Sequence, residues 1–421
     1  MTGCLKPGLL IVSFVVAVCQ AAAASGYEQP PVLGASAILP TDLVSGPNHR
    51  VREAVHNDGF LNRYEIESKY GSFTGITTSK LRKRVHEINV LAGLEAVTRT
   101  KIFKDSVLEA GGDAWHGIKN FVTSPVDSLS GAVSGVAKVF GRIGEHLFGS
   151  KRSDFEDSRF KALIGFSKTK REYAYQFGVD VYSTNTVLQD RLDELAWAGY
   201  AGGLSVAGVM SAIPGGAGVL VSASGGTRLM NEVFRTTAPV DLRQMNQAKL
   251  SDIGVNSDLV DIFIDNTVFT PRQQTLLVAA LADMEGVQNR AAFVKFAALT
   301  KDQDVAHFRQ RMAQMYAAYH KNVAPIAEFV SLGRGSPIRG LGIARTTAGV
   351  VIFHAPLDYL AWTEKMARVF DALNTSVNAM AGISGKELWL AGSLSPMARQ
   401  NIEMAGWRIH DNVESRLLPV D

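Results

Sequence analysis

The sequence has very little cysteine, and what it has lies at one end. Its two cysteines, Cys4 and Cys19, both precede Ser25. If the chain is cleaved before Ser25, the mature protein has no cysteine, which excludes disulfide bonds, a thiolate nucleophile and a cysteine-based zinc site. Stability must then come from burial of apolar side chains, and a chain of 421 residues is long enough for two or three domains.

Recognisable catalytic motifs are absent as well. The nucleophile elbow G-x-S-x-G does not occur, and the zinc motif H-E-x-x-H fails because Val90 stands where the second histidine after His86 is required. The glycine-rich segment 333–340 contains Pro337 and lacks the Lys-Ser/Thr pair of a phosphate-binding loop. We interpret residues 333–348 as a linker.

No cofactor or metal is expected from the pattern. His49, His56 and Asp58 are close in sequence and could approach one another, but nothing fixes their geometry. The formal net charge is only +3, and the one basic cluster, residues 80–84, is typical of the solvated face of a helix. We therefore expect no nucleic-acid partner.

The N-terminus has the order of an export signal. Lys6 precedes the apolar run LLIVSFVVAV, and small residues follow as far as Ala24. The run is too short to span a bilayer comfortably, so residues 1–24 are predicted to be a cleaved signal peptide and the protein to be periplasmic or secreted. Attachment of a lipid at Cys19 is a less favoured alternative, because Val18 is not the small residue that a lipoprotein box requires.

The predicted fold class is α+β, mostly helical: a helical bundle core with an N-terminal β-hairpin and a small C-terminal α/β domain. Residues 25–48 are predicted to be an extended tether, and 49–160 a hairpin followed by long helices. The hairpin falls within 60–78, and Ser79 is expected to cap the next helix. The apolar positions of that helix recur every three or four residues at Leu81, Val85, Ile88, Leu91 and Leu94.

Helical periodicity dominates the middle of the chain. Residues 161–240 are predicted to be a helical region and 241–332 a bundle, in which Thr270 and Gln273 form a capping box. The helix over 302–320 is predicted to bury five apolar side chains: Val305, Phe308, Met312, Met315 and Tyr319.

The spacing of apolar residues changes again in residues 349–421. Strands are predicted at 350–356, 387–392 and 407–411, with helices at 362–373 and 395–405 between them. A β-α-β-α-β order indicates a small α/β domain with mostly parallel strands, because helical crossovers return to the same sheet edge.

One uncharged stretch, residues 195–227, has two interpretations. It is apolar and interrupted by Pro214, but its glycines dilute it and its second arm is short. We expect a buried glycine-rich helical hairpin, with close helix packing at Gly203; contact with a membrane is the alternative.

Chemistry, if present, is expected where the C-terminal strands end, since ligands bind beyond the carboxyl ends of parallel strands. The candidates are His354, Asp358 and Ser395. Each also has a structural interpretation, a packed histidine or a helix cap. The sequence thus favours an exported protein that binds an envelope ligand or protein without catalysis. The alternatives are a membrane-inserting protein that uses 195–227 and an envelope hydrolase that uses these three residues.

Overall fold

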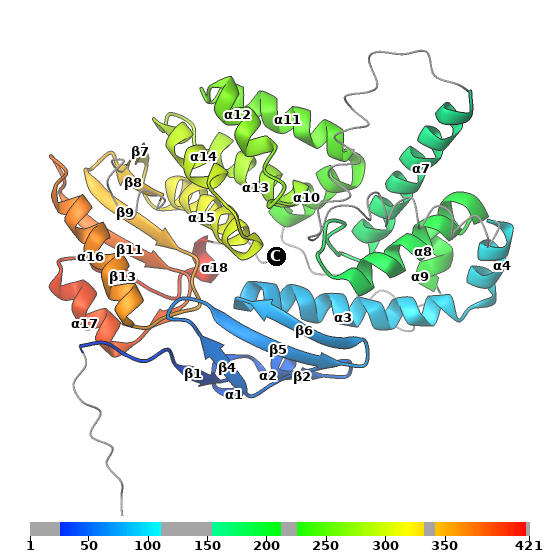
Figure 1. Cartoon of the computed structure of the whole chain (residues 1–421), viewed down its shortest axis with the longest axis horizontal. Coiled ribbons are helices and arrows are strands. Elements are labelled where there is room, and N and C mark those ends of the chain that lie inside the picture. The colour runs from blue at the N-terminus through cyan, green and yellow to red at the C-terminus, as the bar shows by residue number, and fades with distance from the viewer. Residues whose placement is uncertain (1–25, 111–153, 212–224, 332–341, 418–421) are drawn as a thin grey trace, which may run out of the picture.

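The computed structural model describes residues 26–110, 154–211, 225–331 and 342–417. An antiparallel sheet at the N-terminus, a helical middle and a mixed sheet at the C-terminus follow one another along the chain (Figure 1). The α+β class expected from the sequence is confirmed. The predicted signal peptide lies outside the described residues.

The N-terminal sheet has six strands, and the predicted hairpin is only part of it. The hairpin is β5 (Asn62–Ser68) with β6 (Gly71–Ile76), paired in antiparallel register. The rest of the sheet and its small helices are β1 (Val32–Gly34), α1 (Ala35–Ile38), α2 (Thr41–Val44), β2 (Ser45–Gly46), β3 (His49–Val51) and β4 (Ala54–Asn57). Residues 32–46 therefore belong to the folded sheet, where β1 pairs with β4, instead of forming the expected tether.

Helix α3 (Thr78–Thr98) follows the hairpin and lies across the molecule (Figure 1). Its five predicted apolar positions are all buried. The predicted cap is wrong: the N-cap is Thr77, whose side chain accepts the N–H of Lys80, while Ser79 lies inside the helix. Thr77 has a positive φ of 86°, a backbone conformation that sequence periodicity does not reveal.

A second helical group packs against α3. It contains α4 (Lys101–Glu109), α7 (Asp154–Gln176), α8 (Thr186–Gly202), α9 (Val206–Ser211) and α10 (Gly225–Thr236). The first part of the uncharged stretch lies here, and Leu195, Ala198 and Val209 are fully buried in the core of this group. Residues 212–224 lie outside the described part. Within the described part, no helix is long and apolar enough to cross a membrane.

In the uncharged stretch, the glycine that allows close helix packing is not the expected one. A Cβ on Gly202 would lie 1.8 Å from the carbonyl oxygen of Ser106, so the close approach of α8 to α4 requires glycine there. The expected close helix packing at Gly203 is wrong, because no atom lies within 4 Å of where a Cβ on Gly203 would be. Gly203 ends α8 in the left-handed conformation with φ 67°, so its role is to terminate the helix.

The bundle consists of α11 (Pro239–Asp252), α12 (Ser257–Ile264), α13 (Pro271–Ala282), α14 (Arg290–Ala298) and α15 (Gln303–Asn322). The capping box at Thr270 and Gln273 is confirmed by both of its hydrogen bonds. On α15, Met312, Met315 and Tyr319 are buried as predicted. Val305 is 39% exposed and Phe308 is only partly buried, which contradicts the prediction for both, since their side chains line a cavity next to the bundle.

The C-terminal sheet has the strand order β13-β11-β9-β8-β7. Its central strand β9 (Val350–Ala355), β11 (Gly385–Leu390) and β13 (Arg408–His410) are parallel, as predicted. Helices α16 (Glu364–Asn378) and α17 (Pro396–Met404) connect them, the short strands β10 (Tyr359–Leu360) and β12 (Ser393–Leu394) pair nearby, and α18 (Glu414–Leu417) follows.

Two antiparallel strands extend this sheet beyond the predicted domain. They are β7 (Ile326–Val330) and β8 (Ile343–Thr346). The expected linker 333–348 therefore contains a strand, and residues 332–341 lie outside the described part. The sequence pattern missed these strands because β7 follows directly on a long helix and β8 is only four residues long.

The C-terminal sheet is covered on both faces. Side chains of α15 and the bundle cover one face, where Ile352 and Trp389 are buried. Helices α16 and α17 cover the other face, over Val351 and Leu388. Because side chains alternate along a strand, neighbouring residues of β9 enter different cores.

Candidate functional site

His354 lies within β9 and faces the bundle. It is fully buried among Tyr316, Tyr319 and Trp389, with ring centroids 4.3, 5.1 and 6.1 Å away. Neither ring nitrogen has a hydrogen-bond partner among the described residues. Burial lowers the pKa of the imidazole to about 3, and His410 adds to this effect. His354 is thus a neutral core side chain, since its position inside the strand removes it from the crevice beyond the strand end.

Asp358 lies at the junction between the two sheets. Its carboxylate accepts the backbone N–H of Thr78 at 2.8 Å and that of Asn62 at 3.2 Å. Burial raises the pKa of this carboxyl above its ordinary value, and these hydrogen bonds oppose the rise. Asp358 therefore fastens the first turn of α3 and the start of β5 to the C-terminal unit.

Ser395 caps α17, accepting the N–H of Ala398 at 3.0 Å. Its hydroxyl donates to Glu28, whose own backbone N–H donates to the carbonyl of Trp362 at 2.8 Å. No hydrogen bond among the described residues joins Ser395, Asp358 and His354 to one another. Each of the three candidates therefore makes its own structural contact. His354 and Ser395 line neither of the two cavities described below.

His49, His56 and Asp58 do not come together as a metal site. His49 is buried and its Nε2 lies 3.2 Å from the carbonyl oxygen of Leu43, whereas His56 is exposed. Across the described ranges, no group of three His, Cys, Asp or Glu side chains is arranged to hold a metal ion.

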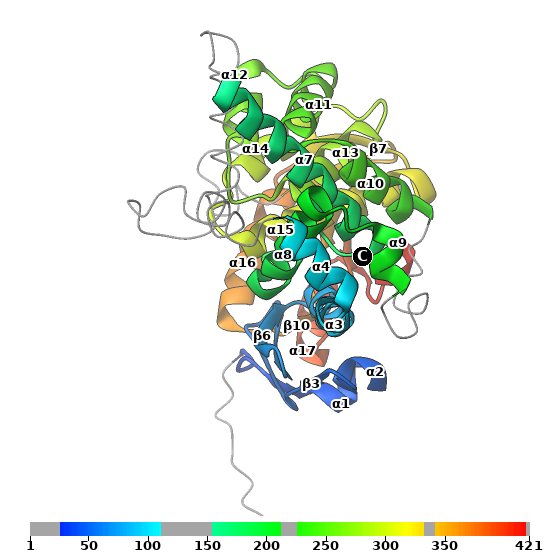
Figure 2. The ribbon, with the colours of Figure 1, turned by 90° about the vertical axis from the view of Figure 1, so that its right-hand side faces the viewer.

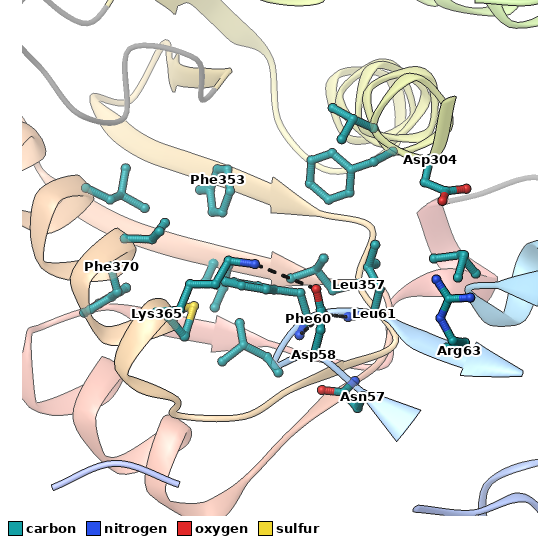
Figure 3. Close-up of a pocket in the computed structure, with 18 of the residues that line it drawn as sticks. Asn57, Asp58, Phe60, Leu61, Arg63, Asp304, Phe353, Leu357, Lys365 and Phe370 are labelled. Carbon is teal, nitrogen blue, oxygen red and sulfur yellow. Dashed lines mark hydrogen bonds and ion pairs between the residues drawn. The ribbon is translucent and has the colours of Figure 1, made fainter. Parts of the chain in front are cut away.

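A cavity of about 540 Å³ lies where the N-terminal sheet, α15 and the C-terminal sheet meet (Figure 3). This volume is within the roughly 300–1,000 Å³ typical of small-molecule sites. Figure 3 shows Phe353 and Phe370 on one side and Phe60 and Leu61 on the other, with Asp304 and Arg63 at one edge. No motif in the sequence marks the residues of this cavity, which come from segments far apart in the chain.

The walls of the cavity are mostly apolar and come from segments far apart in the chain. The inner walls are buried side chains of the α16 side of the sheet: Leu357, Leu360, Met366, Phe370, Leu373, Leu388 and Trp407. The outer walls are less covered, and include Phe308, Phe353 and Val369. Exposed Val305 lies here as well, so its apolar side chain borders the cavity instead of the bundle core.

Charged side chains surround the opening. Lys365 lies 4.9 Å from the ring centroid of Phe60, with its Nζ 3.8 Å from an Asp58 carboxylate oxygen. Asp304 pairs with Lys80 on α3. An apolar interior with a few charged groups at its edge is the usual composition of a small-molecule site.

A second, more polar cavity of about 350 Å³ adjoins the first, and both are lined by Phe308 and Leu357. Glu414 lies here between two arginines, with carboxylate oxygens 3.1 Å from Arg82 and 3.1 Å from Arg311. These ion pairs join α3, α15 and α18 across the junction of the two sheets.

No protein-family model matches the chain, and comparisons with curated proteins and with solved structures gave no match either.

Proposed function

We propose that this protein is an exported, non-catalytic binding protein that holds a small apolar ligand in the 540 Å³ cavity. The observation that carries the proposal is the cavity itself, with its mostly apolar walls at the junction of three structural units. Apolar surface that remains unfilled in a folded protein favours occupancy by an apolar molecule, because water makes few hydrogen bonds there.

The expected affinity is moderate. Each buried methylene contributes about 0.8 kcal/mol, so a chain of ten carbons gains roughly 6–8 kcal/mol. Association costs several kcal/mol of lost translational and rotational freedom, so a simple alkyl ligand should bind more weakly than the micromolar affinity that this apolar gain alone would give.

The two alternatives have less support. A hydrolase needs a nucleophile and a base within hydrogen-bond reach, whereas His354 and Ser395 each have a packing or capping role. Membrane insertion would have to remove Leu195, Ala198 and Val209 from a packed core. Export through residues 1–24 and residence in the periplasm or outside the cell remain part of the proposal.

The test is titration calorimetry with 1-decanol, which carries no charge. The parent should bind it with a negative heat-capacity change, the signature of apolar burial. Val369→Trp should weaken binding at least about tenfold, since the larger side chain fills the cavity.

The matched control is Val240→Trp, on α11 and outside the cavity lining. It should bind like the parent, and circular dichroism should show that both variants are folded. Absence of decanol binding by the parent, or equal binding by all three proteins, would contradict the proposal.

A further inference from the structure

We infer that the ligand is an amphipathic carboxylate, such as a medium-chain acyl or arylalkyl acid, and that Arg63 binds its carboxylate at the cavity edge. The inference rests on the proposed function and names the chemical class of the ligand. It depends on which charged side chains at the cavity opening already have hydrogen-bond or ion-pair partners.

The three carboxylates at the opening all have partners. Asp304 pairs with Lys80, and Asp302 accepts the backbone N–H groups of Asp304 and Val305 at 2.8 and 3.1 Å. Asp58 accepts the N–H groups of two following residues at 3.0 and 2.9 Å and lies 3.8 Å from Lys365. A cationic ligand would have to compete with Lys80 for Asp304 and with Lys365 for Asp58, and Asp302 is already the N-cap of α15.

Arg63, in contrast to these carboxylates, is available to a ligand. Its side chain is exposed and lines the cavity, and among the described residues no hydrogen bond or ion pair involves its guanidinium group. Lys365, the other cation of the lining, is shared with Asp58. The guanidinium group presents a planar fork of donors that matches a carboxylate with two parallel hydrogen bonds.

Strand register places Arg63 beside two other side chains that line the cavity. It is directly opposite His56 on β4 and opposite Ile76 on β6. Directly opposed residues of antiparallel strands share a face of the sheet, so the three side chains form a row, and all three line the cavity. A carboxylate bound at Arg63 has the imidazole of His56 as a neighbour on one side. On the other side Ile76 offers apolar surface to the alkyl chain.

The tail then follows the apolar walls. Beyond Ile76 the lining continues through Leu61 and Phe308 to the side chains that α16 contributes. Figure 3 shows Arg63 at one edge of the cavity and Phe370 at the opposite side. A ligand with a charged head and an apolar tail can therefore use the edge and the interior at once, which a uniformly polar ligand cannot.

The experiment compares three ligands with the same chain: decanoate, 1-decanol and decylammonium. Each is titrated into the parent, Arg63→Gln and Arg50→Gln by calorimetry at low salt and a pH where decanoate is ionised. Arg50 is an exposed arginine of the same sheet outside the cavity lining, so its variant is the matched control.

The parent should bind decanoate at least about tenfold more tightly than 1-decanol, because a charge-assisted bidentate contact is added to the same apolar burial. Arg63→Gln should remove this preference while leaving 1-decanol affinity unchanged, and Arg50→Gln should keep it. Added salt should reduce the preference.

Equal affinities of the parent for decanoate and 1-decanol would overturn the inference and leave the proposed function standing. So would tighter binding of decylammonium, or a preference that survives in Arg63→Gln. If none of the three ligands binds the parent, the proposed function fails together with the inference.

Discussion

Phe353 and His354 are adjacent on β9 and lie on opposite faces of the C-terminal sheet. His354 is fully buried in a set of aromatic rings between the sheet and α15. Phe353 is only partly covered and borders the cavity under α16. The two faces use the same strands and similar apolar residues, yet one is filled by the protein itself and the other leaves space for a second molecule.

The difference arises from what covers each face. The filled face receives the buried part of α15. There the Tyr316 hydroxyl, 2.8 Å from the carbonyl oxygen of Gly342 and 3.2 Å from that of Ile352, shares its one proton between them and fixes the helix on the sheet. The open face meets the loop between β4 and β5, whose Phe60 and Leu61 are only partly buried. Apolar residues therefore fill a core on one face, and on the other they also line the cavity that we propose as the binding site.

The largest expected effect compares a leucine in the filled core with one at the cavity. Leu281→Ala should lower the free energy of unfolding by about 2–4 kcal/mol, because Leu281 is fully buried and its removal creates a new void. Leu373→Ala should cost only about 1–2 kcal/mol, because Leu373 already borders empty space and has fewer contacts to lose. Urea unfolding of both variants measures the difference, and equal losses would contradict it.

The next effect concerns acid stability of the filled face. Burial lowers the pKa of folded His354 to about 3, so the unfolded chain takes up this proton first as the pH falls below 6.5. His354 thus contributes stability that is complete above pH 6.5 and declines below it by about 1.4 kcal/mol per pH unit. His354→Leu should remove that part of the slope.

The control is Leu281→Ala, which removes buried apolar volume and no titratable group. It should keep the parent's dependence of unfolding free energy on pH. Two partly buried histidines, His86 and His410, also have pKa values lowered by burial, so some slope should persist in His354→Leu. A slope unchanged by His354→Leu would mean that the imidazole can be protonated in the folded protein.

The sequence predicts elements whose signals are local. The capping box at Thr270 and Gln273, the period of α3 and the three parallel strands each depend on residues close together in the chain. The expected tether was wrong because β1 is held by pairing with β4, a non-local contact that its own composition does not reveal.

The site was harder to predict for the same reason. The cavity joins segments around Phe60, Val305, Phe353 and Trp407, and each is unremarkable by itself. Polar residues near strand ends are candidates because catalytic groups often occur there, but His354 is buried in a core and Ser395 caps a helix. On α15, Val305 and Phe308 continue the apolar stripe of Met312, Met315 and Tyr319 but line the cavity, so this apolar surface extends beyond the bundle core.

The central claim, that one face of the sheet is filled and the other accepts an apolar ligand, is tested most directly by methyl NMR. Protein labelled at leucine and valine methyl groups is titrated with 1-decanol. The account predicts shifts for Val369, Leu373 and Leu388, which line the cavity, and none for Leu281 in the bundle core. Unshifted methyl groups at Val369 and Leu388, or a shift of Leu281 as large as theirs, would contradict it.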